Sequence, residues 1–224
     1  MRLIRKSPIW IIRLLAVCIL FCSACGAKKN EDFSYTKSSF SIAVKGHICL
    51  LSQKDQRNVT KKPSLSGVTR EDEPLAFSAS ITFIPSATEN PTRISGQLSI
   101  TYTAPEALNG MTLTCHFLTP EDLYGSDLPI TVTYPAPSEN MTVTLPSSSV
   151  AGLLSPGAVL FPIGDVTDVS PLRDGTKTVT IQKNPLSSEI FPSIIIYTLS
   201  ESEIFPLSIT SENEKTQLTI EICD

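Results

Sequence analysis

The sequence predicts a mainly β fold built on one antiparallel sheet. Apolar and polar residues alternate over many short segments, as in 75–83, and a period of two is typical of a strand with one buried face. The alternate positions are mostly Thr or Ser, which favours a sheet whose second face contacts water. Most connections are short, so we expect neighbouring strands to run antiparallel.

About ten strands are expected, with one helical element in the second half. Three serines from Ser147 to Ser149 precede Val150 and Leu154, which predicts a serine-capped helix over 147–154 that ends at Pro156-Gly157. The segment 158–175 is apolar but irregular, and the charged segment 52–74 is expected to be a long loop. The expected strands span 39–50, 75–83, 94–102, 111–117, 130–134, 141–145, 176–183, 192–199, 204–210 and 217–220.

The first 25 residues have the layout of a secretion signal that ends in a cysteine. Four basic residues precede an apolar run of eight residues, Leu14 to Phe21, which is well short of the roughly 20 that a transmembrane helix needs. The small residues Ser23 and Ala24 stand directly before Cys25, which fits a cleavage site.

This stretch resembles a bacterial lipoprotein signal, whose lipobox is an aliphatic residue, two small residues and the lipidated cysteine; Cys22 departs from it at the position usually held by Leu. The resemblance implies a signal peptide over 1–24, acyl chains such as palmitate on Cys25, a flexible tether over 25–38 and a β domain over 39–224. The protein would then face the extracytoplasmic side of the cell membrane, in the cell envelope. The alternative is an uncleaved anchor, or a secreted protein with a chance cysteine.

The charge balance excludes some partners. Removal of the four basic leader residues leaves 14 Lys+Arg against 22 Asp+Glu, so the net charge moves from −4 to −8. An acidic chain argues against nucleic acid and against electrostatic adhesion to anionic lipid heads. We therefore expect attachment through the acyl chains, at roughly 0.8 kcal/mol per buried CH₂. With Cys25 acylated, Cys49, Cys115 and Cys223 allow at most one disulfide.

Catalytic and metal-binding patterns are weak. His47 lies near Cys49, and Cys115 adjoins His116, but alternation directs the second pair to opposite faces of a strand. There is no Gly-x-Ser-x-Gly elbow and no Gly-rich phosphate loop. The acidic run 71–73 is a weak candidate for calcium. We expect no enzyme activity, no cofactor and no metal.

The order of segments resembles the LolA-like lipoprotein-carrier superfamily, including its LppX and LprG relatives. The matching features are SFSIAVKG (39–46), PEALNGMTLT (105–114), a short helix with an apolar loop (147–170) and FPLSI (205–209). The resemblance implies one antiparallel half-barrel of about ten strands, with one or more short helices covering a concave apolar face that holds acyl chains. This chain departs from the family in having one clear helix where two or three are usual.

Two functions are therefore expected. The first is a membrane-anchored, non-enzymatic lipoprotein that binds or carries a lipid or acylated ligand. The alternative, motivated by the 52–74 loop, is a surface interaction or structural module, as a half-barrel or an immunoglobulin-like sandwich, that binds a protein or an envelope polymer. The residues expected to line a lipid site, which a plain core would use equally, are Phe40, Ile42, Phe77, Ile81, Leu98, Ile100, Leu113 and Phe117.

Overall fold

The computed structural model describes residues 33–50, 74–87, 94–172, 175–182, 192–213 and 216–223. The leader, Cys25 and the acidic run 71–73 lie outside these residues, as does nearly all of the predicted 52–74 loop. Within the described part of the chain, no helix is both long enough and apolar enough to span a bilayer. Residues from Phe33 onward form one compact unit.

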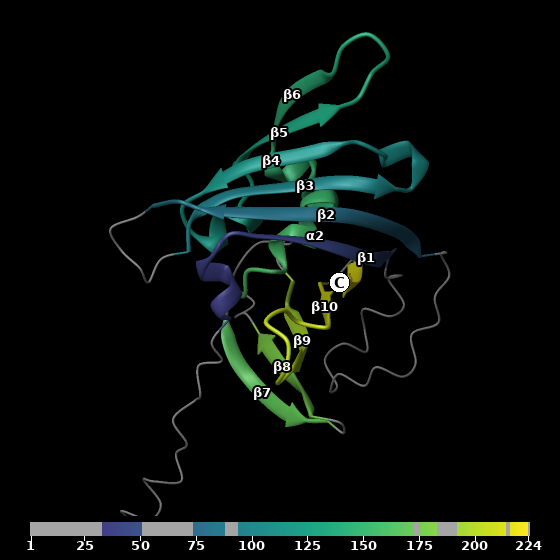
Figure 1. The fold of residues 1–224 in the computed structure, drawn as a ribbon. Coiled ribbons are helices and arrows are strands. Elements are labelled where there is room, and N and C mark those ends of the chain that lie inside the picture. The colour runs from purple at the N-terminus through teal and green to yellow at the C-terminus, as the bar shows by residue number, and fades with distance from the viewer. Residues whose placement is uncertain are drawn as a thin grey trace, which may run out of the picture. The chain divides into compact units, whose positions relative to one another are not determined.

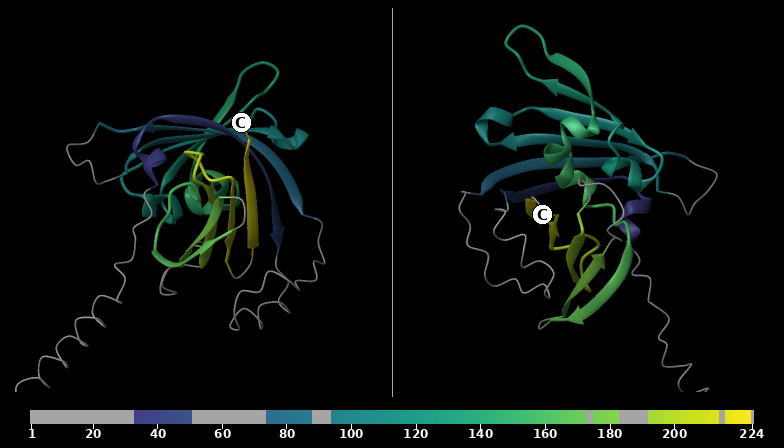
Figure 2. Two further views of the ribbon diagram at one scale, coloured as in Figure 1. Left: turned by 60° about the horizontal axis from the view of Figure 1, so that its bottom comes forward. Right: turned by 180° about the vertical axis from the view of Figure 1, so that it is seen from behind.

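Eleven strands form one antiparallel sheet in the order β6-β5-β4-β3-β2-β1-β11-β10-β9-β8-β7 (Figure 1). The sheet curves around a helix and stays open, with β6 and β7 at its two edges, so the predicted half-barrel is confirmed (Figure 2). The strands are β1 (Phe40–Leu50), β2 (Leu75–Pro85), β3 (Gly96–Ala104), β4 (Thr112–Phe117), β5 (Pro129–Tyr134), β6 (Met141–Pro146), β7 (Asp165–Pro171), β8 (Thr176–Gln182), β9 (Ile194–Ser200), β10 (Ser208–Glu212) and β11 (Thr216–Cys223).

The sequence did not predict β7, which lies in the segment expected to be irregular. The register between β7 and β8 shifts between Val166 and Asp168, so Val166 lies opposite Ile181 and Val169 opposite Val179. An extra residue in one strand breaks the period of two. The two valines of β7 are therefore three positions apart, and the alternation that reveals the other strands is lost.

The convex face carries rows of hydroxyl groups, as the alternation predicted. These side chains pair across neighbouring strands, and such pairs each stabilise a sheet by a few tenths of a kcal/mol to about 1 kcal/mol. The paired oxygens lie 3.1–3.4 Å apart in Ser41–Thr82, Thr101–Thr112, Ser99–Thr114 and Thr133–Thr142.

The helix differs from the prediction at both ends. Ser147–Ser149 form a 3₁₀ turn, η5, and the α-helix α2 spans Ala151–Ala158. Val150 is its N-cap and makes no side-chain capping bond, so the predicted serine cap is wrong. The helix also continues through Pro156. Proline has no N–H, so one backbone hydrogen bond of the helix is lost, but the Pro156 ring is buried together with Leu154 in the core.

The last part of the predicted tether belongs to the folded unit. Ser34–Lys37 form the 3₁₀ turn η1, and Tyr35 is fully buried. The Tyr35 ring lies 6.1 Å from that of Phe40 and 5.2 Å from that of Phe205. Aromatic packing therefore fixes residues 33–38 onto the sheet.

Three buried tyrosine hydroxyls hold the end of α2. Tyr124, Tyr197 and Tyr35 donate to the carbonyls of three successive residues, Ala158, Val159 and Leu160, at 2.8, 2.8 and 2.7 Å. The last carbonyls of a helix have no intrahelical partner. The Ala158 carbonyl also accepts from the Phe161 N–H at 3.0 Å. The hydroxyls therefore matter most at Val159 and Leu160, two buried residues just beyond the helix, whose carbonyls would otherwise lose a donor inside an apolar core.

A fourth hydroxyl acts one turn earlier, where Tyr102 donates to the Leu153 carbonyl at 2.7 Å. Burial raises the pKa of Tyr102, Tyr124, Tyr197 and Tyr35 well above the ordinary value of tyrosine. The four groups therefore stay protonated, and remain donors, throughout the neutral pH range.

Gly157 brings α2 close to the sheet. A Cβ at this position would lie 2.7 Å from Cδ1 of Ile100 and 3.1 Å from Cδ2 of Leu98, and both of those side chains are buried. A Cβ at Gly152, in the same helix, would meet nothing within 4 Å.

Gly157→Ala is expected to lower the free energy of unfolding by about 1–2 kcal/mol, because the added methyl group pushes α2 away from buried β3 side chains. Gly152→Ala is the matched control and should raise it by about 0.5–1 kcal/mol through helix propensity. Chemical denaturation measures both. Equal effects of the two variants would contradict this packing.

Tyr197→Phe is expected to cost about 1–3 kcal/mol of stability, since it leaves the Val159 carbonyl buried without this donor. Tyr134→Phe is the control, because the Tyr134 hydroxyl is exposed and lies 3.3 Å from the Ala107 carbonyl. Its effect should stay within about 0.5 kcal/mol. Similar losses in the two variants would argue against a structural role for the buried hydroxyl.

The protein is expected to lose stability in alkali. Above about pH 10 the unfolded chain releases its tyrosine protons while the folded chain keeps them, so each buried tyrosine lowers the free energy of unfolding by up to about 1.4 kcal/mol per pH unit. The tyrosinate absorbance of these groups should appear together with cooperative unfolding. Tyrosinate forming gradually while the fold stays intact would contradict the raised pKa values.

Candidate functional site

The eight residues expected to line a lipid site are all buried on the concave face. They belong to one core cluster that also contains Leu154, Ala158 and Phe161 from α2 and the segment after it. The Phe161 ring lies 4.9 Å from that of Phe83 and 5.1 Å from that of Phe117. In this part of the sheet, the chain's own helix and Phe161 occupy the position where the resemblance placed an acyl chain.

The concave face becomes exposed toward β6. Ile100, Leu113, Val132 and Val143 form one row across β3, β4, β5 and β6, because each lies opposite the next in the strand register. Ile100 and Leu113 are 0% and 1% exposed, Val132 is half-buried, and Val143 is 51% exposed. The same apolar face therefore passes from core to surface along a single row.

A second row, formed by Tyr102, Met111, Tyr134 and Met141, shows the same change from buried to exposed side chains. The Tyr102 N–H donates to the Met111 carbonyl, and Tyr134 lies opposite Met141. The exposed fractions of these four side chains are 1%, 6%, 41% and 68%. We call Val132, Tyr134, Met141 and Val143 the open strip.

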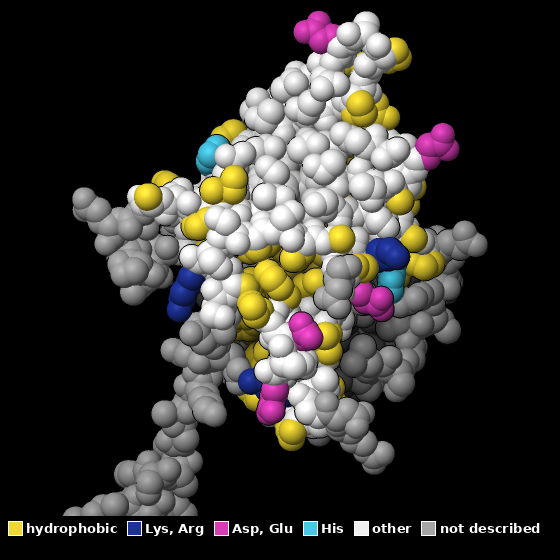
Figure 3. All heavy atoms as spheres, viewed as in Figure 1, with side chains coloured by type: hydrophobic (Ala, Val, Ile, Leu, Met, Phe, Trp, Pro, Cys, Tyr) yellow, Lys and Arg dark blue, Asp and Glu magenta, His cyan; other side chains and the backbone are white. Residues whose placement is uncertain are grey.

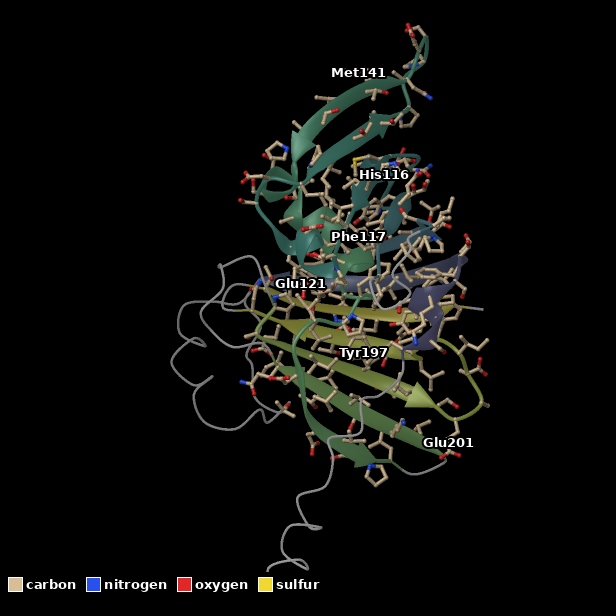
Figure 4. All side chains as sticks on the ribbon, turned by 90° about the vertical axis from the view of Figure 1, so that its left-hand side faces the viewer. His116, Phe117, Glu121, Met141, Tyr197 and Glu201 are labelled. Carbon is tan, nitrogen blue, oxygen red and sulfur yellow. The ribbon has the colours of Figure 1, made fainter. Side chains whose placement is uncertain are left out.

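The position of α2 explains the open strip. The helix packs against β3, β11 and the 3₁₀ turn η4 (Pro120–Tyr124). The β5–β6 hairpin extends away from this centre in Figures 1 and 2. In Figure 4, Met141 lies near the far end of the hairpin, away from the side chains gathered around Phe117 and Tyr197. The apolar face is therefore covered near its middle and at the base of the hairpin, where Ile130 is 0% exposed, and the end of the hairpin that carries Tyr134 and Met141 is left uncovered.

Basic residues are missing from the segment of the chain that forms β3–β6. Residues 94–172 contain no Lys or Arg, and they contain seven acidic residues: Glu106, Glu121, Asp122, Asp127, Glu139, Asp165 and Asp168. Figure 3 shows no Lys or Arg side chain over β3–β6 on the face in view. An anionic head group at the open strip would meet no nearby cation from this segment, so the charge favours neutral ligands.

Reactive groups are not gathered into a site in the described residues. No three His, Cys, Asp or Glu side chains there lie close enough to hold a metal ion. Cys115 is buried, which raises the pKa of its thiol to about 12, and His116 is exposed on the other face, as the alternation predicted. Cys49, Cys115 and Cys223 are all free thiols.

The sequence did not single out the open strip. Its four residues alternate with threonines as the buried strands do, and the same pattern predicts a buried face. The exposure of the open strip depends on where α2 lies relative to the hairpin. This is a matter of tertiary packing, and the residue pattern of β5 and β6 does not reveal it.

No protein-family model matches the chain, and no curated protein matches it either. Among solved structures, it is similar to a protein domain from Vibrio parahaemolyticus described as outer-membrane lipoprotein-sorting, with 6% identity over 92% of this chain and 90% of that one and a TM-score of 0.38.

A DUF1329 family protein from Desulfovibrio piger has 10% identity over 86% of each chain and a TM-score of 0.42. A LolA superfamily protein from Nitrosomonas europaea has 7% identity over 84% of this chain and 85% of that one, with a TM-score of 0.34. Nothing about function follows from similarities at this level.

Proposed function

We propose that this chain is a non-enzymatic, membrane-anchored lipoprotein that binds an acyl chain on the open strip of the β5–β6 hairpin. The observation that supports the proposal is the continuous apolar row from buried Ile100 to exposed Val143. An exposed apolar patch next to a rigid core is typical of a ligand or partner surface.

The site differs from the one expected from the sequence. The eight expected lining residues are buried, and only Ile100 and Leu113 lie in the row that leads to the strip. The ligand would contact Val132, Tyr134, Met141 and Val143. Two strands and two alternate positions give an apolar area of about 5 by 7 Å. It would cover a few CH₂ groups at about 0.8 kcal/mol each, which gives a weak and reversible complex suited to a carrier.

The ligand class follows from charge. Residues 94–172 contain no Lys or Arg, so an anionic phosphate or carboxylate near the strip gains no ion pair from them. We infer that acylated molecules with a neutral head group bind better than fatty acids or anionic phospholipids.

The anchor belongs to the same proposal. Cys25 precedes the folded unit, which begins at Phe33, by eight residues. Acyl chains on Cys25 would hold the domain within a short distance of the bilayer, where a lipid ligand is available. This arrangement would place the protein on the extracytoplasmic side of the cell membrane.

Val143→Asp is expected to weaken binding of a neutral fluorescent monoacylglycerol about tenfold or more, because a carboxylate in the strip must lose water when the chain binds. Thr142→Asp adds the same charge on the opposite face of β6 and should change the affinity less than about twofold. Fluorescence titration measures both, and the corresponding fatty acid should bind more weakly than the monoacylglycerol. Equal losses in the two variants would overturn the site.

Cys25→Ser is expected to abolish lipidation and to leave an unprocessed precursor or release the domain into the medium. Membrane fractionation and the mass of the mature protein measure this outcome. Cys22→Ser is the control, and it should be processed and lipidated as the wild-type protein is. Normal processing and membrane attachment of Cys25→Ser would overturn the anchor.

A further inference from the structure

The two edges of the sheet are protected to different degrees. β7 carries Asp165 and Asp168, and its register shifts between Val166 and Asp168. Charged side chains and bulges are the devices that prevent an edge strand from pairing with another chain. The β7 edge is therefore blocked in two ways.

β6 has neither device. Its six residues, Met141–Pro146, carry no charge, and its register with β5 runs without a shift from Pro129–Pro146 to Tyr134–Met141. Five of the six are exposed, and the strand lies at the outer edge of the sheet in Figure 1. Only Pro146, at its end, limits the length over which a new strand could pair.

The direction of the free backbone groups follows from the register. The Ser147 N–H donates to the Leu128 carbonyl at 2.8 Å, and Pro129 and Pro146, which have no N–H, lie opposite each other. Hydrogen-bonded and non-hydrogen-bonded pairs alternate along an antiparallel ladder. Met141, Val143 and Leu145 therefore direct their backbone groups toward β5, and Thr142 and Thr144 direct theirs outward.

We propose that β6 pairs antiparallel with β6 of a second copy of this chain, on a twofold axis at Val143. The outward groups of Thr142 then bond with those of Thr144 of the partner subunit, and Thr144 bonds with Thr142 of the partner subunit. Val143 lies opposite Val143 of the partner subunit in a non-hydrogen-bonded pair, where side chains are closest.

The strand is complementary to itself, which is why we assign a second copy as its partner. In this register threonine meets threonine on the convex face, as in the Thr101–Thr112 pair of the same sheet. Methionine meets leucine and valine meets valine on the concave face. The nearest acidic residue in sequence, Glu139, would lie opposite Ser147 of the partner subunit, so no like charges meet along the pair.

The dimer would enlarge the apolar surface without covering it. A twofold axis perpendicular to the sheet keeps both concave faces on the same side, so the two open strips join into one. The pairing uses the backbone and does not depend on whether a lipid binds. Because residues 94–146, which contain β3–β6, carry five acidic residues and no basic ones in each copy, added salt should strengthen the dimer.

Crosslinking of the full chain in its native membrane tests the register. Val143→Cys should give an intermolecular disulfide on oxidation. Directly opposite residues have Cβ atoms about 4.5–5.5 Å apart, and a non-hydrogen-bonded pair lies at the close end of this range, near the separation that a disulfide needs. Thr142→Cys and Thr144→Cys, which do not lie opposite themselves, are the matched controls and should crosslink far less. Equal crosslinking at all three positions, or none at Val143→Cys, would overturn the proposal, as would a crosslinked band of another mass.

A second pair of variants tests the backbone bonds. Thr144→Pro removes an outward N–H at an edge position, and Thr144→Ala keeps it. In the detergent-solubilised full chain, Thr144→Pro should raise the dimer dissociation constant about tenfold or more, and Thr144→Ala much less. Sedimentation equilibrium measures both, and unchanged dimerisation of Thr144→Pro would overturn the pairing. Monoacylglycerol binding is measured on the same variant. If Thr144→Pro no longer dimerises but still binds monoacylglycerol, the two proposals are independent, and one can fail without the other.

Discussion

The fold depends on hydrogen bonds from tyrosine hydroxyls to the backbone at the end of α2. Where the chain leaves a short helix inside an apolar half-barrel, its buried carbonyls need donors from the protein itself. Tyr35, Tyr124 and Tyr197 come from three distant parts of the chain and reach three successive carbonyls. A tyrosine suits this role because its ring adds to the core while its hydroxyl supplies one donor. The position of the helix along the sheet is fixed by these bonds and by the close contact at Gly157.

This constraint divides the concave face into two regions. Where α2 and Phe161 are held against β1–β4, the apolar face is a packed core, and the expected lipid-lining residues serve stability. The helix has only eight residues, so it spans about 12 Å, and the end of the β5–β6 hairpin that carries Tyr134 and Met141 remains exposed. The open strip is the part of an apolar sheet face that a short helix leaves uncovered.

Strands with regular alternation were predicted from the sequence, because burial of one face imposes a period of two on residue type. β7 was not, because its bulge places Val166 and Val169 out of phase. The role of Ser147 was also misjudged: its hydroxyl bonds to the Gly125 carbonyl, which is 22 residues away, instead of capping α2. The open strip and the tyrosine bonds depend on contacts between distant segments. Local patterns carry no information about such contacts.

The uncovered hairpin connects the two proposals through a single property. An apolar strip on one face of β5 and β6 and an unprotected edge beside it are both places where another molecule can bind. The β7 edge of the same sheet has two features that prevent pairing with another chain, the charged side chains of Asp165 and Asp168 and a register shift. Both devices are absent from β6, where Thr142 and Thr144 are polar but uncharged, and this leaves its backbone available for pairing. In the two proposals, β6 offers its edge to a second copy and its apolar face to an acyl chain.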